Sequence, residues 1–296
     1  MSQPTTVDDP NKQSGYITNA MSVDVEDYFQ VAAFENNIKR EDWDSLPVRV
    51  EHNTQRILSL FAEYNIKATF FTLGWVAERY PGLVKEIVAQ GHELASHGYG
   101  HQRATTQTPE VFKEDICKAK QLLEDISGVE VKGYRAPSYS IDHSNPWAHD
   151  ELLAAGHSYS SSVYPVKHDL YGIPDAPRFP YRCENGLLEI PITTVKIRNK
   201  NIPFGGGGYF RFFPYWLSKW GINRVNQQDK APAIFYFHPW EIDPGQPRQE
   251  GISFKSRFRH YLNLETMEKR LRSLVQDFKW HTMESVFLHH STNPNQ

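Results

Sequence analysis

Apolar runs and amphipathic stretches alternate along the first part of the chain. An apolar run at residues 17–23 is followed at residues 50–64 by apolar positions that recur with the spacing of a helix. The same succession continues with an apolar run at residues 68–73, an amphipathic stretch at 83–89 and a further run at 92–96. Parallel strands need crossover connections, which are usually helices, so this alternation predicts an α/β fold built on a parallel sheet.

The most clearly marked helix lies between Thr108 and Gly128. Thr108 is a favourable N-cap, Pro109 suits the first turn, and Gly128 suits the position just after a helix. The apolar residues between them keep a helical period. The same patterns predict strands at residues 132–136, 158–163, 187–192 and 233–237, and helices at residues 146–155 and 264–278.

The pattern predicts one domain, from residue 16 to residue 290. A proline-rich middle and a glycine run at residues 205–208 indicate loop insertions around residues 165–220 rather than a second domain. Residues 1–15 and 291–296 contain little to bury, and we expect both segments to be disordered.

Composition excludes several classes of partner. The chain has 296 residues, 39% of them hydrophobic, and a formal net charge of −3. That length suffices for a large core, and the even mixture of charges predicts no nucleic-acid partner. No apolar stretch is long enough to cross a membrane and the first residues lack a signal segment, so we expect no transmembrane segment and a cytoplasmic location. Two cysteines cannot make a disulfide framework.

The first predicted strand ends in a cluster of carboxylates, namely Asp24, Glu26 and Asp27. Carboxylates this close repel one another unless a cation or an arginine neutralises them. A solvated acidic turn is the simpler interpretation of an arbitrary cluster. The position of this one, at the end of an apolar strand, favours a functional site.

A histidine-rich segment follows the third predicted strand. His97 and His101 are four residues apart, and nearby glycines let the backbone fold closely around a metal ion. His92 and Glu93 begin like the HExxH motif of zincins, but the next histidine comes one position too late for it, so we predict a structural role for His92. Such a histidine pair alone is more typical of a surface. With a carboxylate, it completes the ligand set of a catalytic zinc.

Two more candidates stand at strand ends. A buried Arg135 needs a carboxylate partner, for which Asp24 is the obvious candidate, although an arginine that only caps the strand is equally compatible. His238 ends an apolar strand that Pro239 stops. Active-site loops follow the carboxyl ends of barrel strands, so His238 is a candidate catalytic group, with a buried core histidine as the alternative.

In this order, these segments resemble the NodB-homology polysaccharide deacetylases of carbohydrate esterase family 4. The resemblance spans residues 17–240 and rests on the acidic cluster, residues 68–74, 91–93 and 97–101, Arg135-Ala136-Pro137 and Phe237-His238. Three segments, at residues 23–29, 74–79 and 238–244, resemble the branch encoded at bacterial exopolysaccharide and exosortase loci.

The resemblance implies a distorted (β/α) barrel of seven or eight strands and a divalent-metal amidohydrolase, with zinc as the favoured ion. In the family pattern Asp24 is the general base, Arg135 holds Asp24, and His238 is the general acid. His97 and His101 are metal ligands in the same pattern.

The third metal ligand is a carboxylate. Most relatives have two adjacent aspartates, whereas this chain has Asp24-Val25-Glu26-Asp27. Because aspartate is the usual choice of the family, we expect Asp27. Glu26 is the alternative, since strand alternation puts its side chain on the same side as that of Asp24.

Other positions are inferred in the same way. The backbone N–H of Ser138 is the expected oxyanion donor, and Trp240 is a candidate substrate contact. The aspartate that orients the acid histidine in relatives corresponds to residues 158–162, which contain no carboxylate. Glu241 and Asp243 are candidates to replace it.

The expected function is removal of acetyl groups from N-acetylated sugars of a bacterial polysaccharide or its precursor. The expected partner is therefore an acetylated carbohydrate. Aromatic residues at positions 205–220, with Trp75 and Trp240, are candidate platforms for sugar rings, and core packing is the alternative for each. The competing functions are a small-molecule amide or imide hydrolase of the same fold and a non-catalytic glycan-binding protein.

Overall fold

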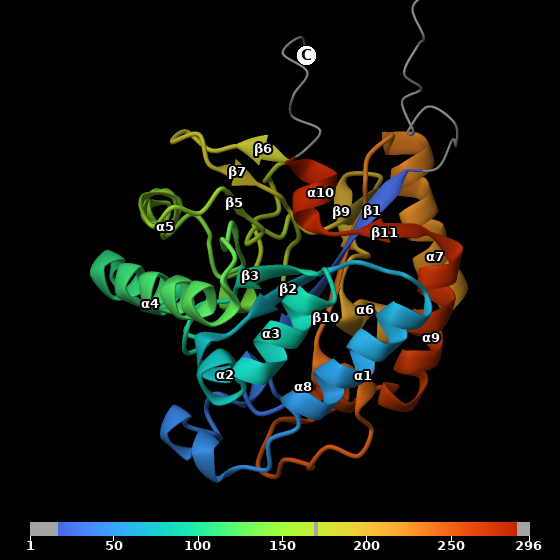
Figure 1. Cartoon of the computed structure of the whole chain (residues 1–296). Helices are drawn as coiled ribbons and strands as arrows, with labels where there is room; N and C mark the ends of the chain where they lie inside the picture. Colours follow the sequence, from blue (N-terminus) through green and yellow to red (C-terminus); the bar gives the residue numbers. More distant parts are fainter. Residues whose placement is uncertain (1–16, 169–170, 289–296) are drawn as a thin grey trace, which may run out of the picture.

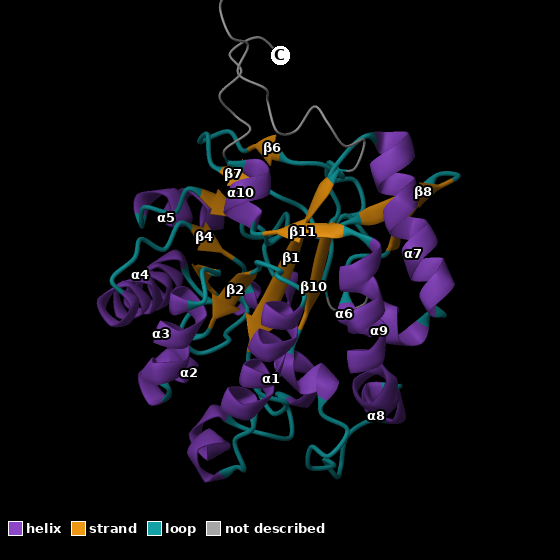
Figure 2. Ribbon diagram, turned by 45° about the vertical axis from the view of Figure 1, so that its right-hand side comes forward, coloured by secondary structure: helices purple, strands orange, loops and turns teal. Residues whose placement is uncertain are grey.

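The computed structural model describes residues 17–168 and 171–288 of the chain. A curled and mostly parallel sheet forms its centre, and helices lie around the outside of the strands (Figure 1, Figure 2). The segments predicted to be disordered, residues 1–15 and 291–296, lie outside the described residues.

The sheet is an open, half-closed barrel. Its strands follow one another in the order β10, β1, β2, β3, β4, β5, β7 and β6, and β11 pairs with β1 beside this path. Neighbours from β10 to β7 pair in parallel, and β6 runs antiparallel to β7. The predicted distorted (β/α) barrel of seven or eight strands is confirmed. The strands are β1 (Thr18–Val25), β2 (Thr69–Thr72), β3 (Glu93–Ser96), β4 (Gly133–Tyr134), β5 (Tyr159–Ser160), β6 (Tyr181–Arg182), β7 (Leu188–Glu189), β10 (Ile234–Phe237) and β11 (Lys279–His281), with a separate hairpin of β8 (Thr194–Ile197) and β9 (Lys200–Pro203).

Most of the predicted helices form where their sequence signals lie. The longest of them, α4, begins after Thr108, whose side chain accepts a hydrogen bond from the backbone N–H of Val111, and ends at Gly128 with φ +72°. That positive φ is the conformation for which glycine is favoured after a helix. The helices are α1 (Val50–Glu63), α2 (Gly74–Arg79), α3 (Pro81–Ala89), α4 (Pro109–Ser127), α5 (Trp147–Ala154), α6 (Gly207–Phe212), α7 (Tyr215–Arg224), α8 (Phe254–Tyr261), α9 (Leu264–Asp277) and α10 (Met283–Phe287).

Alternation along β1 separates the core from the barrel interior. Met21, Val23 and Val25 pack into the main hydrophobic cluster, together with residues of α1 and α9. Ala20 packs instead with interior residues such as Phe71. Because side chains alternate between faces in a strand, the even-numbered positions of β1 face the barrel interior.

The glycine run at residues 205–208, which we took as part of a loop insertion, leads into a helix. Gly207 begins α6, and its backbone packs so closely against Glu241 that an added Cβ would lie 2.3 Å from Oε1 of that carboxylate. A Cβ on Gly205 would lie 2.5 Å from the carbonyl oxygen of Ile234. These glycines therefore allow close approach between backbone segments, which a local sequence pattern cannot distinguish from flexibility.

No described helix combines the length and the apolar composition that crossing a membrane requires.

Candidate active site

The register of the sheet gathers the predicted residues at one edge. Val23 of β1 lies beside Phe237 of β10, so the next residues along the two strands, Asp24 and His238, come together. Ser96 of β3 lies beside Tyr134 of β4, which in the same way places His97 next to Arg135.

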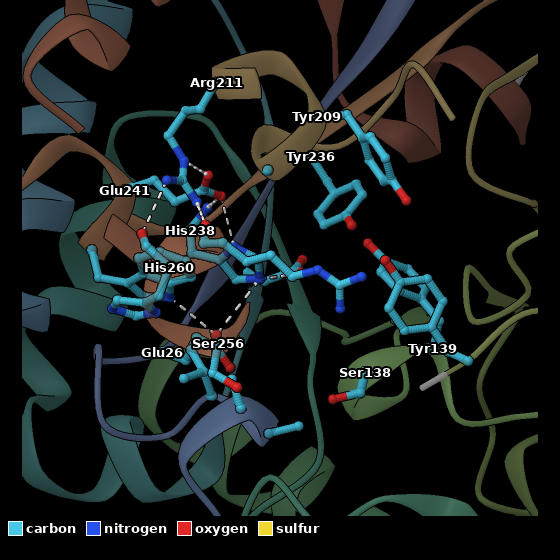
Figure 3. Close-up of a pocket in the computed structure, with 18 of the residues that line it drawn as sticks. Glu26, Ser138, Tyr139, Tyr209, Arg211, Tyr236, His238, Glu241, Ser256 and His260 are labelled. Atoms are coloured by element: carbon cyan, nitrogen blue, oxygen red, sulfur yellow. Dashed lines mark hydrogen bonds and ion pairs between the residues drawn. The ribbon is translucent and has the colours of Figure 1, made fainter. Parts of the chain in front are cut away.

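All four side chains lie at the carboxyl ends of their strands, where α/β barrels build their active sites. A cavity of about 430 Å³ opens at this edge, and Asp24, His97 and His238 line it. Figure 3 shows His238 and Glu26 among the residues around this cavity.

Three buried side chains form a candidate metal centre. One potential ligand atom each from Glu26, His97 and His101 lies within 4.8 Å of the others. Glu26 Oε2 is 2.7 Å from His101 Nε2 and, although buried, accepts no hydrogen bond from a described residue. His97 donates a hydrogen bond from Nδ1 to the carbonyl oxygen of Arg135 at 2.7 Å, which leaves the lone pair on its Nε2 as a ligand. This donor set fits a divalent cation such as zinc.

Electrostatics in this cluster favour the forms that bind a cation. Burial would raise the pKa of Glu26, but His101, His238 and His97 outweigh that effect and lower its pKa to about 2. Burial lowers the pKa of His97 to about 4, against the opposing effect of Asp24. At neutral pH the cluster therefore presents a carboxylate and a neutral imidazole.

Asp27, which we expected as the metal carboxylate, lies elsewhere. Its Oδ2 accepts hydrogen bonds from the backbone N–H groups of Arg49 at 2.6 Å and Val50 at 2.8 Å, where α1 begins. Its Oδ1 accepts from the N–H of Tyr28 at 2.8 Å. Both oxygens are thus committed to backbone N–H groups, and those bound by Oδ2 lie at the N-terminus of α1. The preference for Asp27 is corrected, because Glu26 is the carboxylate beside the two histidines.

Arg135 holds Asp24 as expected. Nη1 of Arg135 donates to Asp24 Oδ1 at 2.5 Å and to the hydroxyl of Ser22 at 2.9 Å. Its other nitrogens donate to the carbonyl oxygen of Ser161 at 3.2 Å and to the Ser161 hydroxyl at 3.1 Å. Both Arg135 and Asp24 are buried. In the segment 158–162, which lacks the family aspartate, Ser161 thus serves as an acceptor for this arginine.

His238 has the carboxylate partner that the sequence left open. His238 Nδ1 donates to Glu241 Oε1 at 2.8 Å, and Glu241 Oε2 accepts from Arg211 Nε at 2.6 Å, as Figure 3 shows. Burial alone would lower the pKa of His238, but the carboxylates of Glu26, Glu241 and Asp24 outweigh it and raise the pKa to about 9. Asp243, the other candidate, is bound instead by Arg49 and Asn53.

Arg211 is the main residue that the sequence did not reveal. It is buried on α6, and besides Glu241 it donates to the carbonyl oxygens of His260, Leu262 and Arg259 at 3.0, 2.5 and 3.2 Å. Thirty positions separate Arg211 from Glu241, and no motif connects them. Only the packing of α6 against the loop after β10 creates this pair.

Trp240 and Ser138 both line the cavity. Trp240 is buried, stacks on His238 with ring centroids 5.1 Å apart, and donates from Nε1 to Glu26 Oε1 at 3.2 Å. His260 also stacks on Trp240. The indole of Trp240 therefore packs against His238 and Glu26 instead of offering an open ring face to a substrate. Ser138 has φ +55° and Tyr139 has φ +51°, conformations that non-glycine residues adopt rarely and that cluster at functional sites.

Two other aromatic or histidine candidates lie away from the cavity. Trp75 packs against Phe29 and Trp43. His92 lies among Phe61 and Phe70, as predicted for a structural histidine. The aromatic residues that do line the cavity include Tyr139, Tyr209 and Tyr236. Figure 3 shows these three tyrosines across the cavity from Arg211 and His260.

Comparison with known families covers most of the chain in two parts. Residues 42–153 match the family model described as polysaccharide deacetylase. This segment belongs to the polysaccharide deacetylase family. Residues 161–288 match a domain of unknown function, DUF3473. The deacetylase segment contributes His97, His101 and Arg135, whereas the second segment contributes Arg211 and His238. Strands from both segments join one sheet.

Curated relatives match part of the chain. A peptidoglycan-N-acetylglucosamine deacetylase of Bacillus cereus is 32% identical over 99 residues, which cover 33% of this chain and 36% of that protein. A peptidoglycan deacetylase of Helicobacter pylori is 32% identical over 108 residues, which cover 36% of each chain. The match therefore spans about a third of the length of these relatives.

A solved structure supports the fold along nearly the whole chain. The crystal structure of a candidate polysaccharide deacetylase from Mycobacterium smegmatis superposes with a TM-score of 0.58 at 17% identity. The superposition covers 97% of this chain and 94% of that one. At this identity, the similarity establishes the fold.

Proposed function

We propose that this protein is a metal-dependent hydrolase that removes acetyl groups from N-acetylated sugars of a bacterial polysaccharide or its precursor. One observation carries the proposal: the candidate metal centre, the arginine-held Asp24 and the carboxylate-held His238 all face one cavity. The match of residues 42–153 to the polysaccharide deacetylase family supports an acetylated glycan as the substrate class.

Asp24 is the general base in the proposed reaction. Arg135 binds Oδ1, so Oδ2 is the oxygen that takes the proton from the attacking water. A divalent cation, with zinc as the preferred ion, would be held by Glu26, His97 and His101 and would polarise the acetyl carbonyl when bound. The backbone N–H of Ser138 is the proposed donor to the developing oxyanion.

His238 is the general acid in the proposed reaction. Its Nδ1 is bound to Glu241, which directs Nε2 into the cavity, 3.9 Å from Asp24 Oδ2. A histidine with a pKa raised to about 9 is protonated at neutral pH. Nε2 therefore carries a proton for the departing amine, while Asp24 receives the proton of the water.

The decisive experiment is acetate release by the full chain from N-acetylglucosamine oligomers, together with elemental analysis of the protein. We expect stoichiometric divalent metal and release of acetate. Asp24→Asn should keep the metal and lose the release. Acetate release by Asp24→Asn at the parent rate would show that the base is another group.

The competing functions have less support. A non-catalytic glycan-binding protein was conceivable because the family aspartate is missing, but Glu241 supplies a carboxylate to His238. A small-molecule amide or imide hydrolase would hydrolyse such amides while leaving acetylated sugars intact. The cytoplasmic location stays a prediction.

A further inference from the structure

Helix α8 presents two phenylalanines to solvent. Phe254 is 83% exposed and Phe258 is 46% exposed, and their rings lie 6.5 Å apart at an interplanar angle of 20°. Because residues four apart share a helix face, the two neighbouring rings, with nearly parallel planes, form one exposed apolar patch. Surface that is this apolar, when it adjoins a cavity, is typical of a binding site.

A buried histidine of the same helix packs against the catalytic candidates. His260 stacks on Trp240 with centroids 4.2 Å apart at 13°, and Trp240 stacks on His238 at 17°. His260 Nε2 donates to Gln246 Oε1 at 2.6 Å, which fixes its ring. Helix α8 is thus held against the site on one side while Phe254 and Phe258 face outward on another.

The exposed rings continue the wall of the cavity. Phe258 lines the cavity together with Asp24 and His238. Phe212 of α6, which is 57% exposed, lines the same cavity. Aromatic side chains therefore line the cavity at Phe212 and at Phe258, and Phe254 adjoins Phe258 beyond that lining.

We propose that Phe212, Phe258 and Phe254 form a platform for sugar rings that neighbour the acetylated sugar, so that the preferred substrate is an oligosaccharide or polysaccharide rather than a single sugar. The apolar C–H face of a pyranose packs on an aromatic ring while its hydroxyl groups stay in water. Continuity with the catalytic cavity identifies a glycan chain as the occupant. This inference rests on the proposed function.

A membrane surface is the rival occupant. Helix α8 also carries Lys255, Arg257 and Arg259, and basic aromatic helices bind anionic lipids. A lipid surface would contact the outer rings but would not make activity depend on the length of a soluble oligosaccharide. Substrate length therefore separates the two occupants.

The activity test compares N-acetylglucosamine, the single sugar, with its hexamer. In Phe254→Ala/Phe258→Ala we expect kcat/KM for the hexamer to fall about tenfold, through KM, and kcat/KM for the single sugar to fall by less, because it has no neighbouring ring to pack on the platform. Trp216→Ala is the matched control, because Trp216 is 67% exposed but does not line the cavity. Phe258→Tyr should keep the parent KM because it keeps a planar ring, whereas Phe258→Leu should not.

A binding test separates this inference from the proposed function. Titration calorimetry of hexamer into Asp24→Asn, with and without the two alanine substitutions, measures the platform without turnover. Loss of hexamer binding in the substituted protein supports the platform, even if the parent releases no acetate and the proposed function fails. Equal hexamer binding with and without the rings overturns the platform. Binding to anionic vesicles that the alanine substitutions abolish, with hexamer kinetics unchanged, overturns it in favour of a membrane.

Discussion

Two buried arginines each hold a carboxylate that lines the cavity. The two carboxylates differ in how directly they would take part in the proposed reaction. Arg135 binds Asp24, the proposed base, which itself lines the cavity. Arg211 binds Glu241, which acts through His238. The same physical device, an ion pair removed from water, thus positions a base in one region and the partner of an acid in the other.

The two pairs also differ in where they come from. Arg135 lies in the segment that matches the deacetylase family, and Arg211 lies in the segment that matches a domain of unknown function. The comparison teaches that the second segment completes the site by supplying the proposed acid with its carboxylate. It therefore belongs to the catalytic unit that we propose.

Removing the direct carboxylate should have the largest effect. Asp24→Asn is expected to lower kcat by about 10³-fold, because general base catalysis is lost while Arg135 keeps its hydrogen-bond acceptor. Steady-state acetate release measures the loss, and metal content serves as the control. A fall of less than tenfold would show that Asp24 is not the base.

The indirect carboxylate should matter less. Glu241→Gln is expected to lower kcat about 10- to 100-fold, as is usual when a group that orients a catalytic histidine is changed. Acetate release under the same conditions gives the comparison with Asp24→Asn. If both variants lost the same activity, the distinction between a direct and an indirect carboxylate would be wrong.

Substitution of either arginine should lower the unfolding free energy by a similar amount, but the two substitutions should lower activity by different amounts. Arg135→Met and Arg211→Met each leave a buried carboxylate without its cation, which should cost about 3–5 kcal/mol of unfolding free energy in urea titrations. Arg211→Met should keep more activity, because the hydrogen bond between His238 and Glu241 remains. Lysine variants at both positions are matched controls that restore the charge. Equal activity losses at equal stability would contradict the comparison.

The smallest effect is expected at Asp27, which the structure places away from the candidate metal centre. Asp27→Asn should lower the unfolding free energy by about 1 kcal/mol, as for a lost helix cap, with metal content unchanged. Glu26→Gln is the matched variant and should lose metal affinity by more than tenfold in equilibrium dialysis. Retention of metal by Glu26→Gln and its loss in Asp27→Asn would restore the original expectation.

Local patterns predicted the framework of the site well. The strands ending at Asp24 and His238 were visible as apolar runs, because a strand buried on both faces must be apolar along its length. The partnership of Arg135 with Asp24 followed from the need to neutralise a buried arginine. Strand alternation also placed Glu26 on the side of Asp24, and the correction at Asp27 arose from preferring the family habit over that alternation.

The sequence alone determined where strands occur along the chain and which chemical groups stand at their ends, since both depend on neighbouring residues in the sequence. Only the tertiary structure decided which distant groups meet. It paired Arg211 with Glu241, brought His260 onto Trp240 and used the glycines at 205 and 207 for close packing. These contacts depend on how α6, α8 and the loop after β10 pack together, and no local spacing encodes that packing.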